Sequence, residues 1–181
     1  TLRWIDAAAQ AGADAVKFQA FTADGLVVPG HELHDAYRRF EFTAPQWDQI
    51  AAHAREQQLG VLVDVFEPHS LQVAQQIGAD GLKVHSTNLT NPMFLERVAA
   101  VGLPVIMGAG GTSRSELQTA AEVFRRHRVP IVVMHGFQAY PTAEADTHLH
   151  RLASLAADFA APTGFAGHAD GAGESILWQN L

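Results

Sequence analysis

The feature of this sequence that most constrains its fold is a regular alternation of short apolar segments with longer helical ones. Six segments have the length and the β-branched content of strands: residues 14–18, 60–66, 81–85, 104–108, 130–136 and 163–167. Between them, apolar residues recur at helical spacing. Near-continuous apolar strands separated by helices are typical of a parallel sheet that is buried on both faces.

Start signals support the helices of this pattern. Thr43 with Gln46, and Ser113 with Glu116, have the spacing of capping boxes. The pattern predicts helices over residues 2–11, 43–58, 68–77, 91–101, 113–127, 144–160 and 173–180. Residues 20–42 are a polar and aromatic excursion that is too long for an ordinary connection, which favours a functional role for it.

Six strand–helix units without a GxGxxG motif favour a (β/α)8 TIM barrel over a dinucleotide-binding fold. A complete barrel needs about 250 residues, whereas this chain has 181. We therefore expect residues 1–181 to form a partial TIM barrel of about six strands and their helices. The chain begins at Thr1 directly in a helical pattern, so we expect its beginning to be missing. Since an open sheet exposes unpaired strand edges, we also expect a homodimer or a longer chain.

Composition excludes several classes of function. The formal net charge is −7 with no basic patch, which argues against nucleic acid as a partner. There is no cysteine, so disulfides and thiolate metal sites are excluded and any metal must use His, Asp, Glu or substrate oxygens. No apolar run approaches the ~18 residues of a membrane span and no signal peptide opens the chain, so we expect no membrane partner and a cytoplasmic location.

Both lysines of the chain lie in predicted strands, although Lys and Arg together number 12. Strand side chains alternate, so Lys17 shares a face with Gln19, and Lys83 shares one with His85. A single lysine at a strand end often only extends into solvent. Two lysines near strand C-termini, where TIM barrels carry their active sites, favour a functional role. With the glycine-rich backbone at 108–111, they predict a site for a ligand that carries phosphate and carboxylate groups.

Other polar residues also fall near predicted strand ends. Asp64 is a charge inside the apolar stretch VLVDVF, which is unfavourable unless it is paired, and a lysine is its natural partner. A purely structural ion pair and a functional one both remain open. His135 ends the fifth strand as a candidate substrate-binding residue, and His168 follows the sixth within GFAGHADG. His168 is the best candidate ligand for a divalent metal acting as a Lewis acid.

Several motifs together resemble the N-acetylneuraminate (sialic acid) synthase family. They are AGADAVKFQ, FEFTAPQWDQIAAHAREQQLGVLVDVFEPHSL, GADGLKVHS, GLPVIMGAGGTSRSEL, HGFQAYPT and GFAGHADG. The resemblance implies a TIM barrel that condenses phosphoenolpyruvate with an N-acetylated amino sugar, releases phosphate and yields a nine-carbon 2-keto acid.

The resemblance also implies roles for individual residues. Lys17 and Lys83 would bind phosphoenolpyruvate, and Ser86 would contact its phosphate or carboxylate. The acceptor sugar would lie near Gln19, Gln138 and Tyr140. The implied metal is manganese or magnesium, held in part by His168.

The sequence departs from the family pattern around the anion site. Asp64 stands where the family has a threonine that contacts phosphoenolpyruvate, the family's STGM reads GAGG with Ala109, and SDH reads AGH with Ala166. The family's C-terminal antifreeze-like domain has no counterpart in this chain. These departures indicate a divergent subfamily with another donor or sugar, or a member without activity. A related 3-deoxy-sugar acid synthase or aldolase, and a non-catalytic barrel that binds a sugar or phosphate ligand, remain alternatives.

Overall fold

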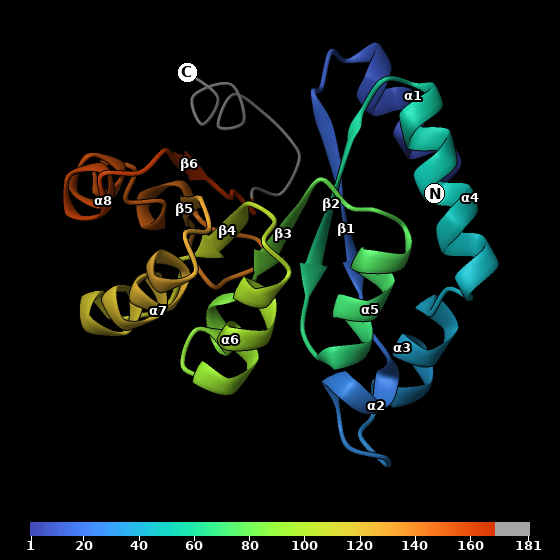
Figure 1. Cartoon of the computed structure of the whole chain (residues 1–181), viewed down its shortest axis with the longest axis horizontal. Coiled ribbons are helices and arrows are strands. Elements are labelled where there is room, and N and C mark those ends of the chain that lie inside the picture. Colours follow the sequence, from blue (N-terminus) through green and yellow to red (C-terminus); the bar gives the residue numbers. More distant parts are fainter. Residues whose placement is uncertain (169–181) are drawn as a thin grey trace. The chain divides into compact units, whose positions relative to one another are not determined.

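The computed structural model describes residues 1–168, which fall into two compact units. Unit 1 is Thr1–Lys83, and unit 2 begins at Val84. The boundary lies inside a strand. Within residues 1–168 there are six strands, and each covers one of the predicted apolar segments (Figure 1).

Unit 1 contains three strands and the helices between them. In chain order its elements are α1 (Leu2–Gln10), β1 (Ala15–Ala20), α2 (Ala23–Leu26), α3 (His34–Phe40), α4 (Ala44–Glu56), β2 (Gly60–Val65), α5 (Pro68–Gln76) and β3 (Gly81–Val84). β1 and β2 are parallel, and Gln19 pairs with Asp64 in their register. Both α4 and α5 pack against β2, and α1 packs against α4. The alternating apolar residues Val61 and Val63 are fully buried under these helices.

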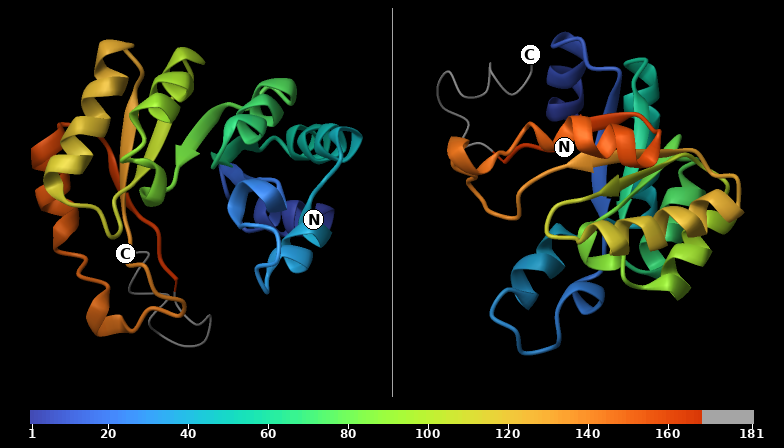
Figure 2. Two further views of the ribbon diagram at one scale, coloured as in Figure 1. Left: turned by 90° about the horizontal axis from the view of Figure 1, so that it is seen from below. Right: turned by 90° about the vertical axis from the view of Figure 1, so that its left-hand side faces the viewer.

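Unit 2 continues the same order of elements. They are η1 (Ser86–Asn88), α6 (Pro92–Ala100), β4 (Val105–Gly108), α7 (Arg114–Arg126), β5 (Ile131–His135), η2 (Glu144–Asp146), α8 (Arg151–Phe159) and β6 (Thr163–Phe165). β4 pairs with β5 and β5 pairs with β6, both in parallel. α6 packs beside α7, and α8 packs on β5 and β6 (Figure 2).

Each unit therefore repeats parallel strands that alternate with covering helices. A parallel strand needs a crossover connection to its neighbour, and a helix supplies it. This is the α/β architecture of the partial (β/α)8 barrel that the sequence predicts.

The predicted capping boxes form as expected. The Thr43 backbone N–H donates to Gln46 Oε1 at 2.8 Å, and that of Ser113 donates to Glu116 Oε2 at 2.8 Å. Each bond satisfies a backbone donor that has no partner within its helix. The first turns of α4 and α7 are therefore determined by residues three positions apart in the sequence.

The excursion at residues 20–42 folds into two short helices rather than an open loop. Asp24 of α2 binds His34 Nε2 at 2.7 Å and lies 3.3 Å from the Arg38 guanidinium, so α2 is tied to α3. Phe21 packs edge-to-face on Tyr37 with ring centroids 5.8 Å apart. These contacts order a segment whose sequence shows only polar and aromatic composition.

The helix predicted for residues 144–160 is wrong in its first half. Residues 144–146 form a single 3₁₀ turn, and α8 begins only at Arg151. His148 has a left-handed backbone with φ 45°, which a continuous α-helix of L-residues does not accommodate. The helix predicted for residues 173–180 lies outside the described residues.

Candidate functional site

In unit 1, both lysines point at the same carboxylate. Asp64 on β2 is 0% exposed, and its Oδ2 accepts from Lys17 Nζ at 3.3 Å and from Lys83 Nζ at a shorter distance. Alternation puts Lys17 and Gln19 on one face of β1, and the register places Asp64 beside Gln19, so Lys17 and Asp64 are diagonal neighbours. The expectation that Asp64 pairs with a lysine is confirmed, and both lysines take part.

The two ammonium groups differ in their access to solvent. The Lys17 side chain is 35% exposed, whereas that of Lys83 is 13% exposed. Burial lowers the pKa of Lys17 below its usual 10.5, the Asp64 carboxylate opposes this by raising it, and the ammonium of Lys83 lowers it further. Because Lys17 is the more exposed of the two lysines, a ligand that approaches from solvent would meet it first.

The two oxygens of the Asp64 carboxylate differ in their hydrogen bonding. Among residues 1–168, its buried Oδ1 has no hydrogen-bond partner, although Oδ2 serves two lysines. Buried polar atoms are nearly always hydrogen-bonded, so an unpartnered one at this place needs an explanation. The arrangement is not that of a fully satisfied structural ion pair.

An aromatic cavity of about 530 Å³ opens beside Lys17 and Gln19. Its lining also includes aromatic side chains from β1, the excursion and α4: Phe18, Phe21, Tyr37, Phe40, Phe42 and Trp47. The sequence reasoning missed these rings as a group. Their density between residues 18 and 47 was the available signal, since clustered aromatics commonly line ligand sites.

In unit 2, the side chain of Gln138 joins three loops that follow strands. Its Nε2 donates to Ser86 Oγ at 3.0 Å and to the Gly110 carbonyl at 3.3 Å. A Cβ at Gly110 would lie 2.8 Å from the Gly136 carbonyl and 2.8 Å from Gln138 Nε2. Gly110 is therefore needed for the close approach of these loops, a role that reading the sequence did not assign to it.

His135 is buried at the end of β5. It is 1% exposed and shares the buried face of β5 with Val133, and its Nε2 donates to the Thr147 carbonyl at 2.7 Å. Burial lowers the pKa of His135 below its usual 6.5, which favours the neutral ring. The substrate-binding role of His135 stays a prediction, and the structure shows that its ring is buried.

Tyr140 and His168 lie together at the end of unit 2. Tyr140 is 85% exposed, and its ring contacts that of His168 edge-to-face at 5.8 Å. The His168 carbonyl accepts from the Thr142 backbone N–H at 2.8 Å. Within residues 1–168 no three His, Asp, Glu or Cys side chains lie close enough together to hold a metal ion. His168 stays a predicted ligand, and the described residues do not by themselves build a metal site.

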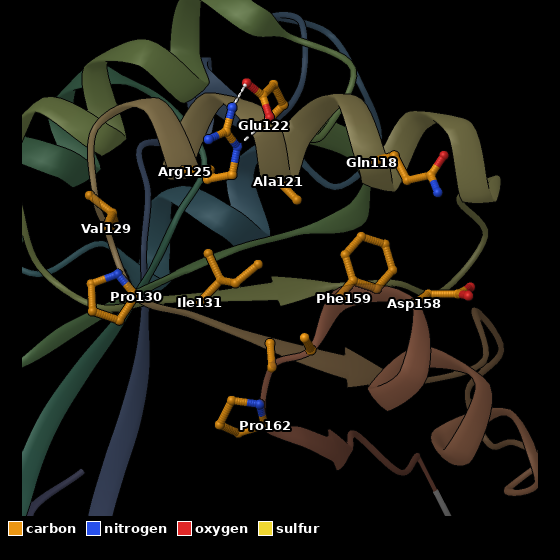
Figure 3. Close-up of a pocket in the computed structure, with 12 residues that line it drawn as sticks. Gln118, Ala121, Glu122, Arg125, Val129, Pro130, Ile131, Asp158, Phe159 and Pro162 are labelled. Atoms are coloured by element: carbon orange, nitrogen blue, oxygen red, sulfur yellow. Dashed lines mark hydrogen bonds and ion pairs between the residues drawn. The ribbon is translucent and has the colours of Figure 1, made fainter.

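A second cavity of about 530 Å³ lies in unit 2 at the N-terminal ends of β5 and β6 (Figure 3). Val129, Pro130 and Ile131 line it where β5 begins, and Pro162 lines it just before β6. The Glu122–Arg125 ion pair of α7 lies at its edge. TIM barrels carry their chemistry at strand C-termini, so this cavity is not a catalytic candidate.

The fold and the positions of the polar residues define a partial (β/α)8 barrel with charged and hydrogen-bonding groups after its strands. The chain belongs to the NeuB family, whose model matches residues 4–178. The resemblance to the N-acetylneuraminate synthase family is thereby confirmed. Its relatives include proteins named as synthases of N-acetylneuraminate 9-phosphate, legionaminic acid and pseudaminic acid, which supports membership in an enzyme family of sugar-acid biosynthesis.

Individual relatives are identical to this chain at about a quarter of the aligned positions. It is 26% identical to N,N'-diacetyllegionaminic acid synthase of Legionella pneumophila over 91% of the chain and 51% of that protein. It is 29% identical to spore coat polysaccharide biosynthesis protein SpsE of Bacillus subtilis over 92% of the chain and 48% of that protein. The chain thus spans about half the length of these relatives.

Solved structures agree with the family assignment. N-acetylneuraminic acid synthetase of Leptospira borgpetersenii, solved in complex with citrate, has a TM-score of 0.89 and 29% identity over 94% of this chain and 60% of that one. A DAHP synthase of Thermotoga maritima has a TM-score of 0.68 at 14% identity, over 94% of this chain and 48% of that one, and shares the fold alone. Within residues 1–168, no helix is long and apolar enough to cross a membrane.

Proposed function

We propose that the whole protein condenses phosphoenolpyruvate with an N-acetylated amino sugar to give a nine-carbon 2-keto sugar acid. The observation that supports this most is the convergence of Lys17 and Lys83 on one point beside Asp64. Family membership supports the reaction class, since several relatives are named as synthases of such acids.

In the proposed reaction, C3 of phosphoenolpyruvate forms a bond to the aldehyde carbon of the sugar, whose oxygen takes up a proton. C2 of the donor is left as an oxocarbenium ion. Water adds to C2 and gives up one proton. The C2–O bond to the phosphate then breaks as the proton of the new C2 hydroxyl passes to the departing phosphate, which leaves a ketone behind. Lys17 and Lys83 would hold the anionic donor and offset its charge throughout, which is catalysis by orientation and electrostatic stabilisation.

The remaining predicted residues keep the roles that the resemblance implies. We propose Gln19, Gln138 and Tyr140 for the acceptor sugar and Ser86 for an anionic oxygen of the donor. Gln138 Nε2 and Ser86 Oγ already bond to each other, so each is positioned by the other. A divalent metal, manganese or magnesium, remains part of the proposal with His168 as one ligand, and no step is assigned to it.

The test is phosphate release by the full-length protein. With manganese, phosphoenolpyruvate and an N-acetylated or di-N-acetylated hexosamine, we expect release that depends on both substrates. Lys17→Met and Lys83→Met should each lower kcat/KM by about tenfold to a hundredfold, because a hydrogen bond to a charged group contributes roughly 1.5–3 kcal/mol.

Arg125→Met is the matched control, since within residues 1–168 the Arg125 side chain pairs with exposed Glu122 on the same helix, α7. It should leave kcat/KM unchanged. Absence of phosphate release with every such acceptor would contradict the proposal. Release with phosphorylated aldoses instead would identify the protein as a 3-deoxy-sugar acid synthase.

A further inference from the structure

The charge balance at the lysine pair carries an inference about which anions the site accepts. Two ammonium groups and one carboxylate meet at Asp64 Oδ2, so the cluster has a formal charge of one positive unit rather than two. Asp64 is 0% exposed, so its charge is screened little by solvent. A bound anion would therefore feel both the attraction of the lysines and the repulsion of Asp64.

The carboxylate also occupies the place on the lysines where a ligand oxygen would bind. Lys83 is almost buried and directs its ammonium at Oδ2, and Lys17 directs its own there from a more exposed position. The unpartnered Oδ1 shows that Asp64 is not held by other donors within residues 1–168. Asp64 therefore forms its ion pairs with the same two lysines that an incoming anion would need.

We propose that Asp64 is a built-in counter-ion of the Lys17–Lys83 pair, which shifts the preference of this site from doubly charged phosphates toward singly charged carboxylates. The part of the proposed donor that fits this charge is its carboxylate group, and a small monocarboxylate such as a 2-oxo acid carries the same group. The physical reason is that Coulomb repulsion from Asp64 is twice as large for a dianion as for a monoanion at the same place. The inference rests on the proposed donor site and names its charge selectivity.

The test is direct binding, without turnover, to the full-length protein at mildly acidic pH, which favours the protonated form of Lys17. The probes are sulfate, which is a dianion throughout this range, and pyruvate, which is a monoanion. Asp64→Asn should bind sulfate at least tenfold more tightly than the unmodified protein does. The increase in its affinity for pyruvate should be smaller. Calorimetry gives both affinities.

Asp48→Asn is the matched control, since it removes the same charge from an exposed residue of α4 that bonds to Gln76. It should change neither affinity. Sulfate affinity that is unchanged or weaker in folded Asp64→Asn would overturn the inference. Circular dichroism and thermal unfolding establish that the variant is folded.

A second variant covers the case in which Asp64→Asn does not fold. Asp64→Thr also removes the charge, so its gain in affinity should again be larger for sulfate than for pyruvate. A folded Asp64→Thr whose affinity for sulfate is not raised would overturn the inference. Since none of these measurements involves catalysis, absent phosphate release would count against the proposed function alone.

Discussion

His135 and Asp64 show how differently two buried polar side chains are accommodated. Asp64 keeps two cationic partners, whereas His135 lies 1% exposed with one hydrogen bond, to the Thr147 carbonyl. A buried ring without a counter-charge is more stable in its neutral form. The two buried side chains are therefore held differently: Asp64 by ion pairs, and His135 by a hydrogen bond to a backbone carbonyl.

The lowered pKa of His135 predicts a pH dependence of stability. Between that pKa and 6.5 the unfolded state binds more protons than the folded state, so stability rises with pH across this window. Stability should be lost as pH falls below 6.5 toward the folded-state value. We expect His135→Gln to show a smaller drop in Tm between neutral and mildly acidic pH than the unmodified protein shows.

His69→Gln is the control for this measurement, because His69 is exposed on α5. It should retain the full drop in Tm. An equal drop in His135→Gln would mean that another group causes the acid sensitivity.

Among the elements, the loops after β4 and β5 are joined through Gly110 and Gln138. Gly110 lies where a Cβ would meet a backbone carbonyl at 2.8 Å, and a backbone atom cannot move aside as a flexible side chain can. The contact between these loops thus depends on the lack of a side chain at Gly110 and on the side-chain amide of Gln138.

We expect Gly110→Ala to lower the free energy of unfolding by about 1–3 kcal/mol, the usual effect of overpacking. It should also separate Gln138 from Ser86, because the added methyl group would lie against Nε2. Urea unfolding measures the first effect, and the KM for the acceptor in the full-length protein measures the second. Unchanged stability and KM would show that these loops rearrange freely.

The helices themselves are local in origin. The capping boxes at Thr43 and Ser113 were predicted correctly, since each needs only residues three positions apart. Glu67 with Ser70 forms a third box that the sequence reasoning missed, because Glu is at the N-cap and Ser three residues later, the reverse of the usual order.

For the whole molecule, unit 1 exposes features that commonly lead to association. Trp4 of α1 is 79% exposed and Phe40 of α3 is 67% exposed. Within residues 1–168, β1 pairs with β2 and no strand covers its other edge. Uncovered strand edges and large apolar side chains favour contact with another chain.

We therefore expect the 181-residue polypeptide by itself to associate at micromolar concentration. Light scattering after size-exclusion chromatography should give a mass above that of one chain, and Trp4→Gln with Phe40→Gln should lower it. Arg39→Gln, also on α3, is the control and should not change the mass. A stable monomer of the unmodified polypeptide would contradict this expectation.

The sequence by itself determined the alternation of strands and helices and the capping of α4 and α7, and it predicted a lysine as the partner of Asp64. Each follows from a short period: 3.6 residues for a helix, two for a strand, and the parallel register of neighbouring strands. The aromatic cavity, the Gln138 contact, the break at His148 and the burial of His135 were decided by the tertiary structure. They depend on groups far apart in the chain, such as Ser86 and Gln138 at a separation of 52 residues, whose distance no local pattern encodes.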